Sequence, residues 1–319
     1  MGVAATDTVR ELADAVGTVI VGNRRQIDLC TIAWLVGGHV LIEDVPGVGK
    51  TMLAKALAKA TGCHFDRVQF TPDLLPGDIT GANIYHPSQG VFEFRKGPVF
   101  TQILLADEIN RATPKTQSAL LEAMEERQVT VDGTTHPLPD PFVVLATQNP
   151  IEYQGTFALP EAQVDRFLVR VSLGYADLAG ELEILDRFGT SSPLDELLPV
   201  TSPADFPKLR RAVGAVHVDD GLKEYLVRIV QRTRHHPDLA LGASARASLG
   251  LLRASQARAL MQGREYVIPD DIKALAGPVL LHRLVLRANA ELRGATGDAI
   301  LDEVLDTEAV PAGGRRAAG

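Results

Sequence analysis

Hydrophobic residues in the first half of the chain follow two spacings, one typical of helices and one typical of buried strands. Apolar positions recur every three or four residues in three stretches, which predicts amphipathic helices over residues 8–20, 26–36 and 50–61. Apolar runs without polar alternation predict strands covered on both faces at 39–43, 104–106 and 142–146, and a further strand is expected at 64–70. This alternation of strands and helices predicts an α/β fold with a mostly parallel sheet.

A hairpin is predicted just before the 142–146 strand. A helix is expected to begin at Pro114, and the residues after it lead to Asp132-Gly133, a strong two-residue turn signal between 128–131 and 134–135. The hairpin over 128–135 is therefore expected to protrude from the sheet.

The strand pattern ends after about residue 173, where serine and proline residues punctuate the chain. Helical stripes follow at 222–230 and 249–260, and a third helix is expected to start at Pro269 and continue toward Val285. We predict a small all-helical second domain. The expected boundaries are an α/β domain over 1–173, a linker over 174–203, a helical domain over 204–308 and a disordered tail over 309–319.

Composition agrees with an ordinary globular protein of two domains. The 319 residues are 45% hydrophobic and 23% charged, and the formal net charge is −8, which gives no general attraction for nucleic acid. Cys30 and Cys63 have neither disulfide nor zinc spacing, so both are expected to be buried. Without a leader or an apolar stretch long enough to span a bilayer, a cytoplasmic location is expected.

Residues 46–51, Pro-Gly-Val-Gly-Lys-Thr, follow the apolar strand and form the most informative motif of the chain. Its glycines allow backbone N–H groups to face an anion, Lys50 supplies a charge for the β- and γ-phosphates, and the Thr51 hydroxyl can ligate Mg²⁺. Asp44 stands where the usual first glycine would be, and we expect it to cap the turn and not to face the phosphates. The motif predicts a phosphate cradle.

Two carboxylates, Asp107 and Glu108, follow the apolar run 103–106 at the edge of the sheet where ligands of α/β proteins bind. We expect Asp107 to hold the Mg²⁺ hydration shell and Glu108 to orient and deprotonate a water that attacks the γ-phosphorus. A solvated turn is the alternative interpretation of this acidic pair, and the neighbouring cradle disfavours it.

Three more polar residues are candidates for the same chemistry. Asn149 follows the 142–146 strand, where its amide could position the attacking water, although asparagine before proline is also a common turn. Arg166 is a candidate arginine finger acting from an adjacent subunit, and a salt bridge to Asp165 or Glu161 is its alternative role. Arg246 lies in the first turn of a helix capped by Ser244, where a cation opposes the helix dipole, so a phosphate partner is favoured over solvent.

Together these residues resemble the AAA+ ATPases, and specifically the MoxR family, over nearly the whole chain. Residues 41–51 are similar to the family's Walker A motif, 105–111 to its Walker B motif and 146–150 to its sensor 1. The resemblance gives Arg166 the finger position, Arg246 the sensor 2 position and Val21-Gly22 the adenine contact. Family members usually carry proline where Ala245 stands.

The resemblance implies a set of site residues. The nucleotide would be contacted by Val21, Gly22, Pro46, Gly47, Val48, Gly49, Lys50, Thr51, Met52 and Arg246. Thr51 and Asp107 would hold the metal. The residues acting in catalysis would be Lys50, Glu108, Asn149, Arg166 and Arg246. The fold implied is an AAA+ P-loop domain followed by a helical lid, with ATP and Mg²⁺ in the cleft between them.

The activity implied is Mg²⁺-dependent ATP hydrolysis in a homo-oligomeric ring, expected to be a hexamer, that remodels or matures a partner protein. A protein with a von Willebrand factor A domain is the partner type that the resemblance suggests, and metal-cofactor assembly is a variant. Residues 73–97 and 128–135 resemble the helix-2 insert and the pre-sensor hairpin. An ATP-driven nucleic-acid motor and a non-hydrolysing, nucleotide-gated scaffold are the alternative functions.

Overall fold

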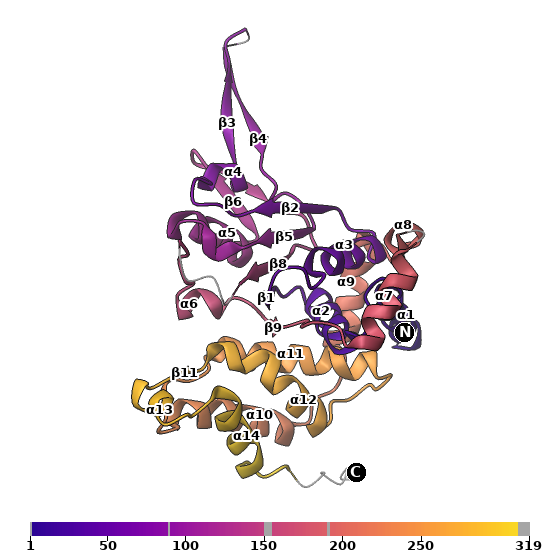
Figure 1. Cartoon of the computed structure of the whole chain (residues 1–319), viewed down its shortest axis with the longest axis vertical. Helices are drawn as coiled ribbons and strands as arrows, with labels where there is room; N and C mark the ends of the chain where they lie inside the picture. The colour runs from indigo at the N-terminus through magenta and orange to yellow at the C-terminus, as the bar shows by residue number, and fades with distance from the viewer. Residues whose placement is uncertain (1, 89, 150–154, 190–191, 312–319) are drawn as a thin grey trace, which may run out of the picture.

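The structure is a computed structural model that describes residues 2–88, 90–149, 155–189 and 192–311. Figure 1 shows an α/β part with the sheet and, below it, a second part made mainly of helices that ends at the C-terminus. The α/β fold class and the helical second domain expected from the sequence are both confirmed.

Five parallel strands form the central sheet in the order β2-β5-β8-β1-β9. These strands are β1 (Val40–Glu43), β2 (Phe65–Gln69), β5 (Ile103–Asp107), β8 (Val143–Gln148) and β9 (Val169–Val171). All four strands expected from the sequence are present, and β9 completes the sheet as its last strand, beside β1. Because the strands are parallel, the loops that follow β1, β5 and β8 leave the sheet at one common edge, which we call the carboxyl edge.

Helices cover both faces of this sheet because successive side chains of each strand point to opposite sides. Val40 and Ile42 pack with the helices of the N-terminal region, whereas Leu41 packs with Leu104 and the apolar side of α5. The helices of this domain are α1 (Gly2–Val19), α2 (Arg24–Val36), α3 (Lys50–Ala60), α4 (Pro76–Thr80), α5 (Pro114–Glu126) and α6 (Glu161–Val164), with a 3-10 turn η1 (Ile109–Arg111).

Two antiparallel hairpins extend from the α/β domain. The predicted hairpin is formed by β6 (Gln128–Val131) and β7 (Thr134–Pro137). The stretch expected as an insert contains a second hairpin, β3 (Gly81–His86) with β4 (Val91–Lys96), which projects far from the body in Figure 1. Tyr85 and Phe92 lie side by side on it with their ring centroids 5.1 Å apart.

The region from 174 to 203, expected as a linker, contains the helices α7 (Leu178–Phe188) and α8 (Pro193–Glu196). Beyond it lies the second domain, whose elements are η2 (Pro203–Asp205), α9 (Phe206–Gly214), α10 (Asp220–His235), β10 (Leu239–Leu241), α11 (Ala245–Met261), α12 (Pro269–Leu280), η3 (Leu281–Arg283), β11 (Val285–Leu286), α13 (Ala288–Leu292) and α14 (Gly297–Thr307). Residues 312–319 of the expected disordered tail lie outside the described residues.

Two details of the second domain were predicted wrongly. The domain is not entirely helical, because β10 and β11 pair as a short antiparallel ladder. The α-helix that starts at Pro269 ends at Leu280 and continues only as the 3-10 turn η3 to Arg283, short of Val285, which lies in β11. Strands of two or three residues are too short to give a period-2 pattern, and their pairing depends on contacts distant in sequence.

The second domain is attached to the sheet through a buried arginine. The Arg283 guanidinium donates to the carboxylate of Asp165 at 2.7 Å and to the backbone carbonyls of Asp165 and Phe167 at 3.0 and 2.6 Å. Ser244, at the start of α11, donates to the same Asp165 carboxylate at 3.0 Å. Asp165 therefore joins the second domain to the segment that leads into β9.

Both cysteines are buried and unpaired, as expected. Burial raises the pKa of Cys30 to about 12, so its thiol stays protonated and behaves as a small apolar group. Among the described helices, none combines the length and the apolar character required to cross a membrane.

His39 makes the stability of the fold depend on pH. It is buried between β8 and the end of α5, where its Nδ1 accepts from Val144 N at 3.0 Å and its Nε2 lies 3.2 Å from Met124 O. Burial lowers its pKa to about 3, with Arg127 adding to the effect. Because the unfolded chain takes up this proton near its ordinary pKa and the folded chain does not, stability from His39 is present above about pH 6.5 and falls as the pH drops toward 3.

We expect the free energy of unfolding to decrease by up to about 1.4 kcal/mol per pH unit across this window from His39 alone. Urea titrations of wild type and His39→Gln at pH 7 and pH 4.5 measure the effect, with the exposed His235→Gln as the control. The pH dependence should be shallower only in His39→Gln, and equal slopes in all three proteins would contradict the assignment.

Candidate active site

The 46–51 motif forms an open turn between β1 and α3. Gly47 and Gly49 have φ angles of 88° and 91°, a backbone conformation that residues with a side chain rarely adopt. A Cβ at either glycine would meet no atom within 4 Å, so glycine is required by conformation and not by lack of space. Because α3 begins at Lys50, the first N–H groups of this helix have no intrahelical partner and form a site suited to an anion.

Asp44 holds the start of this cradle in place through hydrogen bonds. Its side chain is buried and accepts hydrogen bonds from Val45 N at 3.0 Å, Gly174 N at 2.9 Å and Ser172 Oγ at 3.2 Å, and from Leu173 N. Lys50 Nζ donates to the Asp44 carbonyl oxygen at 2.9 Å. As expected, the Asp44 carboxylate caps the turn, and it also fixes the cradle to residues 172–174 after β9.

Asp107 lies at the end of β5 with its carboxylate held on both sides. Oδ1 accepts from Thr147 Oγ at 2.6 Å, and Oδ2 accepts from Arg67 Nη2 at 2.6 Å. The carboxylate of Asp107 and the hydroxyl of Thr51 are the hard oxygen donors that Mg²⁺ takes, usually with several waters and phosphate oxygens completing its shell. These two donors fit the metal role expected from the sequence.

Glu108 has a strained backbone, which is common at functional sites. Its φ and ψ of 55° and 50° are in the left-handed region, and its N–H donates to Thr147 Oγ at 2.8 Å. Its Oε2 accepts from Gln69 Nε2 at 2.8 Å and from Arg111 Nη1 at 2.9 Å. Thr147 Oγ thus links the two residues, donating to the Asp107 carboxylate and accepting from the Glu108 backbone N–H.

The strand order brings the cradle, Asn149 and the acidic pair to neighbouring positions. β8 lies between β5 and β1, so Asn149, which follows β8, leaves the sheet between the acids that end β5 and the cradle that follows β1. Asn149 is almost completely buried. Pro150 of the same motif lies outside the described residues.

Arg166 and Arg246 form a separate cluster around Glu125. Arg166 Nε lies 3.5 Å from one carboxylate oxygen of Glu125, and Arg246 Nη2 lies 2.5 Å from the other. Arg246 is also 3.6 Å from Asp165. The salt bridges that the sequence suggested for Arg166, to Asp165 or Glu161, are replaced by this shared partner on α5.

This arginine cluster lies at the amino edge of the sheet, opposite the cradle. Arg127, two residues after Glu125, donates to the carbonyls of Gly37 and Phe142, which directly precede β1 and β8. Leu168, two residues after Arg166, donates to His39 O just before β1. The length of β1, at about 3.3 Å per residue, therefore separates both arginines from the cradle of the same chain.

The Val21-Gly22 segment, which is expected to contact adenine, lies close to the residues that follow β9, and these residues also contact Asp44 beside the cradle. Val21 is buried, and its Cγ1 lies 3.8 Å from the point where a Cβ on Gly180 of α7 would be. Gln26 Nε2 donates to Ser172 O at 2.9 Å. Residues 172–174 thus lie between the start of α2 and Asp44. The Val21-Gly22 segment, just before α2, is therefore near the carboxyl edge of the sheet, where the cradle also lies.

Two family profiles match the chain. Residues 39–169 match the ATPase family associated with various cellular activities (AAA), and residues 231–304 match the AAA lid domain. A solved structure of an ATPase candidate from Cytophaga hutchinsonii has a TM-score of 0.91 and 40% sequence identity, covering 98% of this chain and 97% of that one.

Relatives of known name agree with these matches. The chain is 53% identical to YeaC of Bacillus subtilis, a protein named as uncharacterized, over 93% of this chain and 92% of that protein. It is 42% identical to chaperone MoxR1 of Mycobacterium tuberculosis, over 97% of this chain and 84% of that protein. The chain belongs to the MoxR family of AAA+ ATPases.

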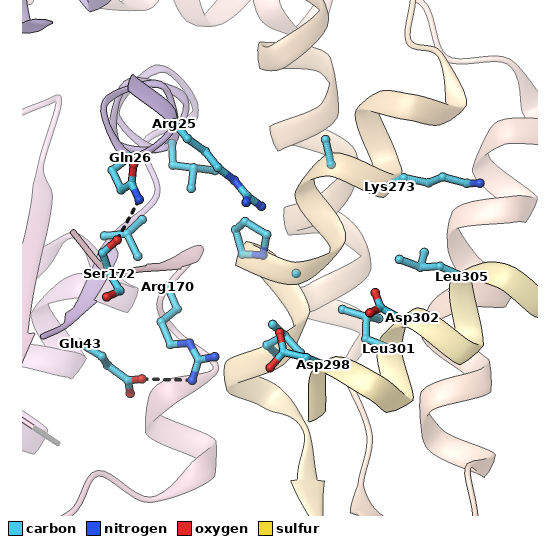
Figure 2. A pocket seen from close by; sticks show the side chains of 16 residues that line it. Arg25, Gln26, Glu43, Arg170, Ser172, Lys273, Asp298, Leu301, Asp302 and Leu305 are labelled. Atoms are coloured by element: carbon cyan, nitrogen blue, oxygen red, sulfur yellow. Dashed lines mark hydrogen bonds and ion pairs between the residues drawn. The ribbon is translucent and has the colours of Figure 1, made fainter. Parts of the chain in front are cut away.

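A cavity of about 580 Å³ separates the two domains of this MoxR-family chain on the β9 side of the sheet. Figure 2 shows the side chains that line it: Arg25 and Arg170 come from the α/β domain, and Asp298 and Asp302 come from helix α14 of the second domain. No cradle residue from 46 to 52 lines it. Instead, Glu43 and Ser172 line it, close to the residues that anchor the cradle.

Sequence reasoning missed four residues that shape the site in this MoxR-family chain. Thr147 was within the motif assigned to Asn149, and its position two residues before Asn149 was the available signal. Arg67 and Gln69 alternate along β2 in register with β5, so that Gln69 is paired with Asp107. Glu125 gave no local signal, because its role depends on two arginines distant in sequence.

Proposed function

We propose that the chain is a Mg²⁺-dependent ATPase that works as a homo-oligomeric ring and uses hydrolysis to remodel or mature a partner protein. The observation that supports it best is the convergence of three groups on adjacent strands: the Lys50 cradle after β1, Asn149 after β8, and Asp107 with Glu108 after β5. Membership of an ATPase family agrees with this chemistry.

The cradle would hold the triphosphate through backbone N–H groups from residues 47–52. Lys50, whose ammonium now donates to Asp44 O, would turn this donor toward the β- and γ-phosphates. Thr51 and Asp107 would hold Mg²⁺, which supplies charge neutralisation at the phosphate oxygens.

Glu108 would act as the base. Its carboxylate is at the carboxyl edge, held by Gln69 and Arg111, and it would orient a water and accept its proton as the water attacks the γ-phosphorus. The Asn149 amide, between the cradle and the acids, would hold that water in line with the bond that breaks.

The arginines support an oligomer. Because Arg166 and Arg246 lie at the amino edge, they would reach the nucleotide of an adjacent subunit and not their own, so each active site would be completed by the next copy. The sequence placed Arg246 at the nucleotide of its own chain, and the amino-edge position favours a role in trans instead.

The client is inferred from the family. Chaperone MoxR1 is named for a chaperone role, and a protein with a von Willebrand factor A domain is the client type we propose, with metal-cofactor assembly as a variant. The projecting β3–β4 hairpin, with Tyr85 and Phe92 exposed near its end, is a candidate client contact.

Phosphate release from ATP tests the proposal. We expect steady turnover with Mg²⁺, restored by Mg²⁺ after its removal by a chelator, and tight ATP binding measured by calorimetry. Absence of ATP binding at millimolar concentration would refute the proposal. Strong stimulation by DNA and none by any protein would favour the nucleic-acid motor.

A further inference from the structure

Helix α7 carries apolar side chains on its solvent side. Leu178, Leu182 and Leu185 are 77, 54 and 68% exposed, although the spacing of four and three residues places them on one stripe. Gly180 is the only residue of α7 that is fully buried. Helix α7 contacts the body mainly through Gly180, Arg187 and Phe188, so the apolar stripe is left uncovered, which points to a covering partner.

Acidic residues accompany these leucines. Glu181 falls within the same stripe, one turn after Leu178, and Asp186 follows Leu185, and both are exposed. We call Leu178, Glu181, Leu182 and Leu185 the α7 stripe. A partner that covers it should combine apolar groups with positive charge.

Such a surface lies on the opposite side of the same chain. In the first half of α11, Arg246, Leu249 and Arg253 are exposed and are spaced by three and four residues, which places them on one line of the helix. Leu249 is 55% exposed. We call these three residues the α11 stripe. In Figure 1 α7 lies beside α1 on one side of the molecule, and α6, which precedes Arg166, lies on the other.

The two stripes would come within reach of each other when Arg166 and Arg246 of one copy approach the cradle of the next copy. Leu249 and Arg253 lie about 4.5 and 10 Å along α11 from Arg246, from a rise of 1.5 Å per residue. On the cradle side, α7 is capped by Asp177, which lies within about 11 Å of Gly174 because only three residues separate them. The Gly174 N–H donates to the carboxylate of Asp44, which anchors the cradle.

We propose that the α7 stripe docks on the α11 stripe of a second copy of this chain, with the leucines in contact and Glu181 facing Arg253. The contact joins two different surfaces, so repetition of it generates a closed ring or a filament. This inference rests on the proposed ring and names the surface that forms it.

Sedimentation velocity of the full chain with a non-hydrolysable ATP analogue tests the contact. Leu182→Asp combined with Leu185→Asp should weaken self-association at least about tenfold, because both side chains would leave the interface core. Val227→Asp, at an exposed apolar position on α10, should assemble like wild type. Since the substituted leucines are exposed, the melting temperature and the analogue affinity of the isolated subunit should stay unchanged.

A charge exchange tests the pairing itself. Glu181→Arg and Arg253→Glu should each weaken assembly, and the chain carrying both should recover it. If wild type assembles and the double-leucine variant assembles equally well, the docking surface is refuted while the ring stands. If wild type itself remains monomeric with the nucleotide analogue, both the ring and the docking surface are refuted.

Discussion

Replacing Glu108 by glutamine is expected to stop ATP turnover while ATP still binds. Glutamine keeps the size of the side chain and can still contact Gln69 and Arg111, but it cannot accept the proton of the attacking water. Loss of a general base costs about 10² to 10⁴ in rate. Phosphate release and calorimetric titration with ATP measure the two quantities separately.

Lys50→Ala is the matched comparison, because it removes the ammonium group that we propose contacts the bound phosphates. Both affinity and turnover should then fall. Glu122→Gln, an exposed carboxylate on α5, is the control and should behave like wild type. Normal turnover by Glu108→Gln would refute the base assignment, and normal ATP affinity of Lys50→Ala would refute the phosphate role of Lys50.

The sequence was sufficient for the parts of this site that depend on local structure. The cradle needs only glycines with positive φ, a following helix and a preceding strand, all of which occur within residues 40–60. The acidic pair could be placed because uninterrupted apolar runs indicate buried parallel strands, and such strands end at one edge. The adjacency of β5 and β8 agrees with a position of Asn149 near the acids.

The remaining features depend on contacts between residues distant in sequence. Nothing near Arg246 indicates that it shares Glu125 with Arg166, because this requires the lid to dock through Arg283 on Asp165. The β10–β11 ladder was missed for the same reason. Thr147 was missed because a hydroxyl that bridges the Asp107 carboxylate and the Glu108 N–H gives no pattern in the sequence.

Asp44 shows how one position can be predicted in role but not in partners. Its place in the motif indicated a capping carboxylate, and the contact with Val45 N agrees. Its stronger attachment is to residues 173–174, about 130 positions later. This attachment joins the start of the cradle to the segment that leads into α7.

Mixing two inactive variants is expected to restore part of the activity if Arg166 acts on the neighbouring subunit. Glu108→Gln supplies an intact Arg166, and Arg166→Ala supplies an intact Glu108. In randomly mixed rings, roughly a quarter of the interfaces would then pair an intact Glu108 with an intact Arg166 from the next copy. Since an arginine finger contributes about 10³ to 10⁵ in rate, these interfaces would dominate the measured phosphate release.

The control for this experiment is a chain that carries both substitutions. Mixed with either single variant it cannot form an interface with both groups intact, so no activity should return. Arg246→Ala should repeat the result with Glu108→Gln, because Arg246 shares Glu125 with Arg166 at the amino edge, far from the cradle of its own chain. If subunit exchange is verified by differently labelled chains and activity still does not return, Arg166 acts within its own subunit or not at all, and the amino-edge cluster is a structural salt bridge.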